Sequence, residues 1–132
     1  YPDRPQLISA YDVPLVDNQI NASALYDLVR RYSPEFAVVE LVHSMPKQGV
    51  ASSFNFGKSY GVALGVIGSL KIPSAHVSPT KWKKYFGLSA DKEQSRALAI
   101  SKWPASEHFR RKKDNGRAEA ALLALYGAQT QR

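Results

Sequence analysis

Seven charged residues stand directly before an apolar segment near the C-terminal end of the sequence. Residues 110–119 read Arg-Arg-Lys-Lys-Asp-Asn-Gly-Arg-Ala-Glu, so Asp114 and Glu119 lie among five cations. Acids in the first turn of a helix offset its dipole, which is the ordinary structural explanation. Carboxylates held among cations would also suit a metal ion that works beside bound phosphates. The sequence leaves both explanations open for these two acids.

Glu40 is a third acid with a possible chemical role. It interrupts an apolar run, with Val38 and Val39 before it and Leu41 and Val42 after it. An unpaired charge inside a buried strand is heavily penalised. Glu40 therefore either faces solvent at the end of its strand or holds a metal at the edge of an α/β sheet, where such domains generally place their sites.

The residue types restrict which metal these acids could hold. The chain has no cysteine, which excludes disulfides, thiolate chemistry and cysteine-ligated zinc. Its three histidines, His43, His76 and His108, are scattered along the sequence. Carboxylates prefer hard cations, so we expect Mg²⁺, with Mn²⁺ as a substitute.

The positive charge of the chain is concentrated in its second half. The net charge is +7, yet residues 1–66 carry five Lys or Arg against six Asp or Glu, and residues 67–132 carry thirteen against five. A one-sided basic field suits a polyanion such as nucleic acid or an anionic membrane. The best candidate for a membrane span, residues 61–70, has ten residues. About twenty are needed to span a bilayer. We therefore expect an intracellular protein that binds nucleic acid and no membrane.

Cations and aromatic rings alternate in one segment of the basic half. Residues 81–86 read Lys-Trp-Lys-Lys-Tyr-Phe, Lys92 and Arg96 follow one turn apart, and residues 110–113 form a dense basic cluster. Such cations would bind phosphates without reading the base sequence. The rings of the first segment either stack on exposed bases or belong to the core.

Strand-like and helix-like segments alternate along the chain. The expected strands are Leu7–Val13, Phe36–Val42 and Ala75–Val77; the expected helices run from Asn21 or Ser23 to about Ser33, from Ser52 to Leu70, from Pro79 or Thr80 to Phe86, from about Ala90 to Lys102, and from about Asn115 to Tyr126 before Gly127. This alternation predicts an α/β layered domain, and 132 residues fit a single domain.

Four glycines recur on one face of the longest predicted helix. Gly57, Gly61, Gly65 and Gly68 are spaced by three or four residues. Each costs roughly 1 kcal/mol relative to alanine in a helix, so we expect another backbone to approach this face closely. Packing on the sheet is the favoured explanation, and a dimer seam is the alternative.

Five motifs follow one another along the chain: Glu40-Leu-Val-His-Ser-Met-Pro-Lys-Gln-Gly-Val50, Phe54-x-Phe-Gly57-x3-Gly61-x3-Gly65, Val77-x-Pro79-x-x-Trp-Lys-Lys84, Asp91-Lys-x-x-Ser-Arg96 and Lys112-Lys-Asp-x-Gly-Arg-Ala-Glu-Ala-x-Leu-Leu-Ala124. Together they resemble the RuvC-type Holliday-junction resolvases, most of all the branch shared by bacteria, their phages and plant chloroplasts. The resemblance extends over residues 7–127. It implies an RNase H-like fold, with a mixed central sheet flanked by helices, and a homodimer that acts on four-way DNA junctions.

The resemblance also implies a catalytic apparatus. Glu40, Asp114 and Glu119 match the family's acids that hold two Mg²⁺ ions for phosphodiester hydrolysis, and Lys83 and Lys92 match its active-site lysines. The loop over residues 44–53 would approach bases at the crossover, with His43 near the junction centre. The full expected DNA-binding set is His43, Lys47, Gln48, Ser52, Ser53, Lys81, Lys84, Arg96, Arg110, Arg111, Lys112, Lys113 and Arg117.

One feature of the family has no match in the sequence. The family begins with a strand of the type Gly-Ile-Asp-Pro-Gly, whose Asp is the first metal ligand, and the present sequence starts beyond that point. We therefore expect further residues before Tyr1 in the natural protein, and an N-terminally incomplete domain here. The alternative function is an RNase H-like module that binds branched DNA without cleaving it. The resemblance places the protein in the cytoplasm of a bacterium or phage-infected cell, or alternatively in a chloroplast.

Overall fold

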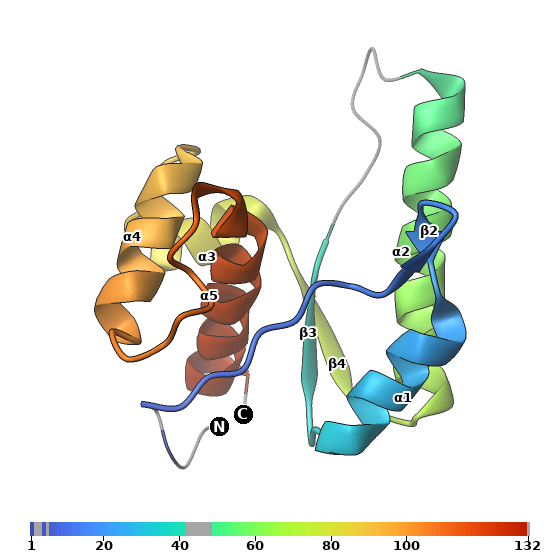
Figure 1. Ribbon diagram of the computed structural model, residues 1–132, viewed down its shortest axis with the longest axis horizontal. Helices are drawn as coiled ribbons and strands as arrows, with labels where there is room; N and C mark the ends of the chain where they lie inside the picture. Colours follow the sequence, from blue (N-terminus) through green and yellow to red (C-terminus); the bar gives the residue numbers. More distant parts are fainter. Residues whose placement is uncertain (2–3, 5, 42–48, 132) are drawn as a thin grey trace. The chain divides into compact units, whose positions relative to one another are not determined.

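The computed structural model describes residues 1, 4, 6–41 and 49–131 and divides into two compact units (Figure 1). One unit, here the catalytic-candidate unit, comprises Tyr1–Asp12, Val38–Glu40 and Ala75–Arg132. The other, the hairpin unit, comprises Val13–Ala37 and Leu41–Ser74.

The hairpin unit contains a short β-hairpin and two helices that contact each other. Strands β1 (Leu15–Val16) and β2 (Gln19–Ile20) pair antiparallel, and both residues of the intervening turn, Asp17 and Asn18, have positive φ. Asp and Asn tolerate this left-handed conformation, which two-residue hairpin turns require. The sequence reading did not predict this hairpin.

Both helices of the hairpin unit were predicted. Helix α1 (Ala22–Tyr32) begins at the predicted cap, because the Asn21 side chain accepts a hydrogen bond from the Ala24 N–H at 3.1 Å. It ends at Ser33, which adopts a left-handed conformation with φ 43°. Helix α2 (Val50–Ser69) begins two residues earlier than predicted and contacts α1.

The glycine face of α2, defined by Gly57, Gly61, Gly65 and Gly68, is open in the described part of the chain. A Cβ added at any of the four would meet no described atom within 4 Å. Within the hairpin unit no neighbour therefore covers these glycines, and the expectation that the face packs on the sheet stays a prediction. The alternative, a seam between two copies of the chain, stays a prediction.

Strands β3 (Ala37–Glu40) and β4 (Ser74–Val77) form a two-stranded sheet, and all but the first residue of each strand belong to the catalytic-candidate unit. The Ala37 N–H donates to the Pro73 carbonyl at 2.9 Å, so both strands start at the same end of the sheet. Such a parallel pair needs a long crossover connection. Helices α3 (Pro79–Tyr85), α4 (Lys92–Lys102) and α5 (Asn115–Thr130) lie together in this unit, with a 3₁₀ turn over Lys112–Asp114 before α5 (Figure 1).

The buried core of the described residues lies among these three helices. Trp82 of α3, Phe109 of the loop before α5, and Leu122 of α5 are fully buried. The remaining members of the core are Val77, Ala99, Trp103, Ala118, Ala121, Leu123 and Tyr126. Trp82 is thus a core residue and is not exposed for stacking on a base, which decides between the two explanations for that ring.

Gly127 marks a close approach of α5 to β3. The helix was predicted to end before this glycine, but it continues to Thr130. A Cβ at Gly127 would overlap the Cγ2 atom of Val38. The glycine therefore serves packing between helix and strand and does not terminate the helix.

Two other expectations were wrong in detail. The predicted strand Leu7–Val13 is not a strand in the structure; Ile8 and Ala10 pack against the core, but the segment joins no sheet. The helix expected from Ala90 begins at Lys92, because Asp91 caps it through a 2.9 Å hydrogen bond from the Glu93 N–H.

In the described part of the chain, no helix has the length and apolar character to cross a membrane.

Candidate functional site

Glu40 is held at the end of β3 by a tryptophan of α3. The Trp82 indole N–H donates a 2.8 Å hydrogen bond to the Glu40 Oε2 atom. Trp82 has no exposed surface, whereas Glu40 is half-buried. A charge-assisted hydrogen bond of this length fixes the carboxylate and compensates part of its lost hydration. Glu40 therefore neither faces solvent freely nor lies unpaired in the core.

Glu119 is held by the residue that follows Trp82. The Lys83 ammonium group lies 3.3 Å from the Glu119 Oε2 atom, and both side chains are mostly buried, with 21% and 25% of their surface exposed. The same ammonium group lies 5.5 Å from the centroid of the Trp82 ring. The adjacent residues Trp82 and Lys83 thus bring α3 into contact with an acid of β3 and an acid of α5.

Glu40 and Glu119 have the chemistry of ligands for a hard cation. Both are carboxylates, and each has only one oxygen in the contact described above, which leaves oxygen atoms for a metal. Within residues 1, 4, 6–41 and 49–131, no three Asp, Glu, His or Cys side chains gather closely enough to hold an ion. The predicted trio of Glu40, Asp114 and Glu119 stays a prediction.

Asp114 has a different environment from the other two acids. Its side chain is 2% exposed. The Arg111 guanidinium donates from Nε and Nη2 to Oδ1 at 3.1 and 2.8 Å, and the Arg111 backbone N–H donates to Oδ2 at 2.8 Å. Arg117 adds an ion pair at 3.8 Å. Both carboxylate oxygens of Asp114 are therefore engaged by arginine.

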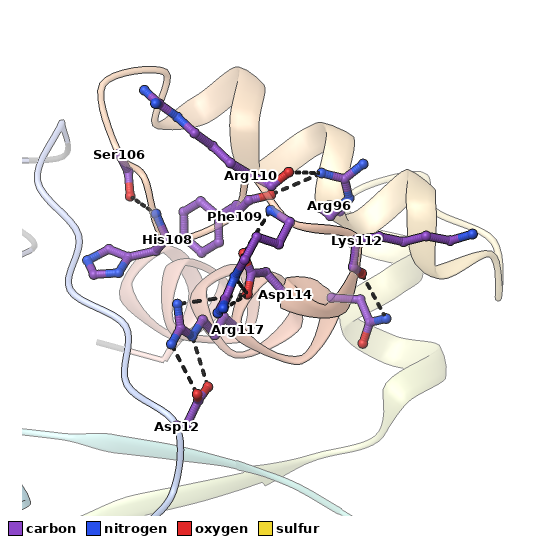
Figure 2. Close-up of polar contacts among 11 residues, drawn as sticks. Asp12, Arg96, Ser106, His108, Phe109, Arg110, Lys112, Asp114 and Arg117 are labelled. Carbon is purple, nitrogen blue, oxygen red and sulfur yellow. Dashed lines mark hydrogen bonds and ion pairs between the residues drawn. The ribbon is translucent and has the colours of Figure 1, made fainter.

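Arg117 continues this network to the N-terminal segment. Its Nε and Nη2 atoms donate to the two oxygens of Asp12 at 2.9 and 3.0 Å (Figure 2). Figure 2 shows Arg117 between Asp114 and Asp12, with contacts to both. We refer to Asp12, Arg111, Asp114 and Arg117 as the arginine–aspartate network.

The network lowers the pKa of its acids. Hydrogen bonds from the Arg111 side chain hold the pKa of Asp114 below its ordinary value, and those from Arg117 do the same for the pKa of Asp12. Arg117 responds in the opposite direction, because the Asp12 carboxylate raises the pKa of its guanidinium. All of these groups are charged at neutral pH.

Arg96 of α4 holds the segment that precedes Asp114. Its Nη1 atom donates to the carbonyl oxygens of Phe109 and Arg110 at 3.2 and 2.9 Å (Figure 2). Glu93, one turn earlier, fixes the guanidinium through a 2.9 Å ion pair, and the hydrogen bond from Arg96 lowers the pKa of Glu93. The Arg96 guanidinium therefore has hydrogen-bond and ion-pair partners within the protein.

The predicted DNA-binding residues Lys81, Lys84, Arg110, Lys112 and Lys113 are exposed, and so is Lys92, which the resemblance makes an active-site lysine. Lys81 and Lys84 lie on α3, Lys92 is the first residue of α4, and residues 112 and 113 lie in the 3₁₀ turn. None of these lysines forms an ion pair with another described residue. Arg110 makes only an exposed contact to Glu107 at 3.5 Å, which contributes little.

The remaining predicted DNA contacts belong to another part of the chain. Ser52 and Ser53 lie in the first turn of α2. His43, Lys47 and Gln48 lie outside the described residues. Their predicted roles at a junction stay predictions.

Two contacts of the site were missed by the sequence reading. Trp82 was interpreted only as a core or stacking ring, and its hydrogen bond to Glu40 spans 42 positions. Asp12 lies in the predicted strand Leu7–Val13 and was given no role, and its partner Arg117 lies 105 positions away. The position of Trp82 next to the predicted catalytic residue Lys83 was a usable signal for its contact with Glu40. No local pattern marks the contact between Asp12 and Arg117.

Comparison with known proteins supports the fold. No protein-family model and no curated protein matches the chain. Solved structures that are similar to the chain include RuvC of Thermus thermophilus, and T. thermophilus RuvC in complex with a Holliday junction substrate. Their TM-scores are 0.64 and 0.63, and each is 18% identical in sequence. The similarity covers 83% of the present chain and 66% of each RuvC chain, so the chain spans just under two thirds of their length.

These similarities fit the order of elements found above, in which a strand ending in an acid, a long helix, a second strand and three helices follow one another. They confirm the predicted α/β class. The chain therefore has the RNase H-like fold of the RuvC structures.

Proposed function

We propose that the protein is a structure-selective DNA endonuclease that resolves four-way junctions by divalent-metal-dependent phosphodiester hydrolysis. The observation that carries this proposal is that adjacent residues of α3, a tryptophan and a lysine, each contact one acid. Trp82 contacts Glu40 and Lys83 contacts Glu119, although the two acids are far apart in the sequence. The RuvC-like fold and the basic C-terminal half support the same function.

Glu40 and Glu119 are the proposed metal-holding residues. Mg²⁺ held there would lower the pKa of a bound water and stabilise charge on the scissile phosphate. Asp114 was predicted as a third ligand, but its oxygens are engaged by Arg111. We therefore assign no metal contact to Asp114.

The protein's own residues prepare this site in three ways. The buried Trp82 fixes the direction of the Glu40 carboxylate through its N–H. Lys83 neutralises Glu119, and its ammonium group is positioned to stabilise negative charge on a phosphate placed at the acids. Lys92, exposed at the start of α4, is a second cation for the phosphate.

The exposed cations are the proposed contacts to the DNA backbone, and the partner molecule is a four-way junction. A homodimer would place two such sites on one junction, which paired nicks require. The glycine face of α2, flanked by Val50 at 88% and Phe54 at 69% exposure, is our proposed dimer surface. Small residues permit two helix backbones to approach each other closely.

A binding module without cleavage is the rival function. It retains the basic surface and the fold, but it makes Glu40 and Glu119 ordinary structural acids. The ion pair of Glu119 with Lys83 is the observation that favours this rival, because a paired acid needs no metal.

A labelled four-way junction distinguishes the two functions. We expect full-length protein with Mg²⁺ to produce paired symmetric nicks, and Glu40→Gln to abolish nicking while it still binds the junction. Glu35→Gln, which removes an exposed acid outside the site, should cleave normally. Without Mg²⁺ the junction should still be bound, and binding should weaken steeply with salt. Binding without nicks by the full-length wild type would establish the rival.

A further inference from the structure

The tetrabasic segment, residues 110–113, is fixed at both of its ends. Arg96 holds the carbonyl oxygens of Phe109 and Arg110 at the first end. At the second end the Asp114 N–H donates to the Arg111 carbonyl at 2.9 Å, and Asp114 accepts the Arg111 N–H in return at 2.8 Å. These reciprocal bonds close a tight turn.

The carboxylate of Asp114 is the centre of this turn. Its burial at 2% exposure requires compensation for the lost hydration, and the Arg111 guanidinium and backbone N–H provide it. Arg111 binds Asp114 through two nitrogens, the geometry in which arginine pairs most strongly with a carboxylate. The Arg111 guanidinium is therefore bound by an acid of its own loop, although 52% of the side-chain surface is exposed.

The cations of this region consequently fall into two groups. Arg96, Arg111 and Arg117 are held by carbonyl oxygens or by acids of the protein. Lys112, Lys113 and Arg110 are exposed. In Figure 2 the side chains of Arg110 and Lys112 extend away from the arginine–aspartate network.

We propose that Asp114 and Arg96 are positioning residues that hold the tetrabasic segment in the shape that presents Arg110, Lys112 and Lys113 to DNA phosphates. This inference rests on the proposed function for its ligand, junction DNA. It replaces the predicted metal-binding role of Asp114 and removes Arg96, Arg111 and Arg117 from the predicted phosphate contacts. Preorganising a loop strengthens binding because less conformational entropy is lost on association.

Amide hydrogen exchange tests the positioning role without DNA or metal. The reporters are the amide hydrogens of Arg111 and Asp114, which both lie in the closed turn. In Asp114→Asn we expect their exchange to accelerate roughly tenfold or more, because a charge-assisted hydrogen bond is lost. Lys113→Gln is the matched control: it removes a cation of the same loop but leaves both bonds, so exchange should remain at the wild-type rate.

Junction binding and metal binding then separate positioning from metal ligation. With Asp114→Asn we expect a weaker junction Kd, by roughly tenfold, but unchanged Mn²⁺ affinity and an unchanged cleavage rate at saturating junction. A metal ligand would show the reverse pattern, with lost Mn²⁺ affinity, lost cleavage and unchanged Kd. That reverse pattern, or unchanged amide exchange, overturns the proposal.

A second variant covers the case in which Asp114→Asn does not fold. Arg96→Gln removes the guanidinium, whose side chain is 20% exposed, from the Phe109 and Arg110 carbonyls. We expect faster exchange at the Arg111 amide and a weaker junction Kd here too, and wild-type values for both would overturn the proposal. If the wild type binds no junction, the proposed function fails, while amide exchange still decides whether Asp114 and Arg96 order the segment.

Discussion

Trp82 performs two tasks with one side chain. Its ring is fully buried in the core, and its N–H fixes Glu40 at 2.8 Å. Partners that orient a metal ligand from outside the coordination sphere influence affinity and rate strongly, although they never contact the metal. The candidate site therefore depends on a residue whose burial alone would classify it as structural.

Replacing Trp82 by Phe separates these tasks. Trp82→Phe retains an aromatic ring in the core but removes the donor to Glu40. We expect Mn²⁺ affinity or the cleavage rate to fall by roughly 10- to 100-fold. Trp103→Phe is the control, because Trp103 is buried in the same core at 3% exposure. If Trp82→Phe and Trp103→Phe lost similar stability and both lost cleavage activity, the proposed role of the Trp82–Glu40 hydrogen bond would be contradicted.

The arginine–aspartate network predicts acid sensitivity. The pKa of Asp114 is lowered by Arg111 and that of Asp12 by Arg117, so the folded state holds these protons less tightly than the unfolded state. Their contribution to stability is therefore fully present above the ordinary carboxyl pKa of about 4 and is lost as the pH falls through the folded-state value. Glu93, held by Arg96, contributes in the same direction.

Thermal melting as a function of pH measures this contribution. We expect the Tm of wild type to exceed that of Asp114→Asn near neutral pH and the two values to converge between about pH 5 and pH 2. A constant difference in Tm over this range would show that the charge of Asp114 does not stabilise the fold.

Single residues were predicted unevenly from the sequence. Glu40, Glu119 and Lys83 were identified by motif, and the structure brings each into contact with α3 or makes it part of α3. Asp114 was identified as important, but its partners were not, because the Arg111 contact depends on the closed turn. Local sequence cannot specify a pair separated by 105 positions, such as Asp12 and Arg117.

At the scale of elements, α5 is positioned by a glycine. Gly127 lets the helix lie directly against Val38 of β3, the strand that carries Glu40. Helix α5 carries Glu119, so this contact helps to set where the two acids stand. The helix and the strand are thus packed tightly at the end opposite to the start of α5.

Gly127→Ala tests this packing. The added methyl group would overlap Val38, so we expect a loss of about 1–3 kcal/mol in the free energy of unfolding. Gly116→Ala is the matched control in the same helix, because a Cβ there meets no described atom within 4 Å. The control should be neutral or gain up to about 1 kcal/mol from helix propensity. Denaturant unfolding of both variants measures the difference, and equal stabilities would contradict the close approach.

The glycine face of α2 offers a test of dimerisation. Gly61→Leu adds bulk where the described chain has open space, so it should leave the fold intact. If this face is the dimer seam, the variant should be monomeric by light scattering at concentrations where wild type is dimeric. Asn55→Leu adds bulk elsewhere on the exposed surface of α2 and should remain dimeric. A dimeric Gly61→Leu variant would exclude this face.

The positions of helices and strands along the chain were predicted better than the contacts between these elements. All five helices and the strands β3 and β4 were anticipated within a few residues, because capping residues and apolar runs are local signals. Leu7–Val13 failed because an apolar, strand-like pattern does not provide a partner strand. The glycines of α2 show the same limit, because their spacing indicates a face of the helix but does not indicate what covers that face.

For the whole molecule, the division of charge matches the division of tasks. The described acids of the candidate site lie in the same unit as the basic C-terminal half, with exposed lysines on α3, on α4 and in the 3₁₀ turn. In the proposed function, the cations hold phosphates and the acids hold the metal that acts on one of them. The composition indicated a polyanion and the motifs indicated a RuvC-type protein; the structure added a fold similar to that of T. thermophilus RuvC.

The position of bound manganese tests the central claim most directly. Crystals of the full-length protein soaked in Mn²⁺ should give an anomalous peak beside the carboxylates of Glu40 and Glu119, and this peak should be absent in Glu40→Gln. No peak beside these two acids in well-ordered wild-type crystals, or a peak at Asp114 in their place, would contradict the proposed metal-dependent nuclease site.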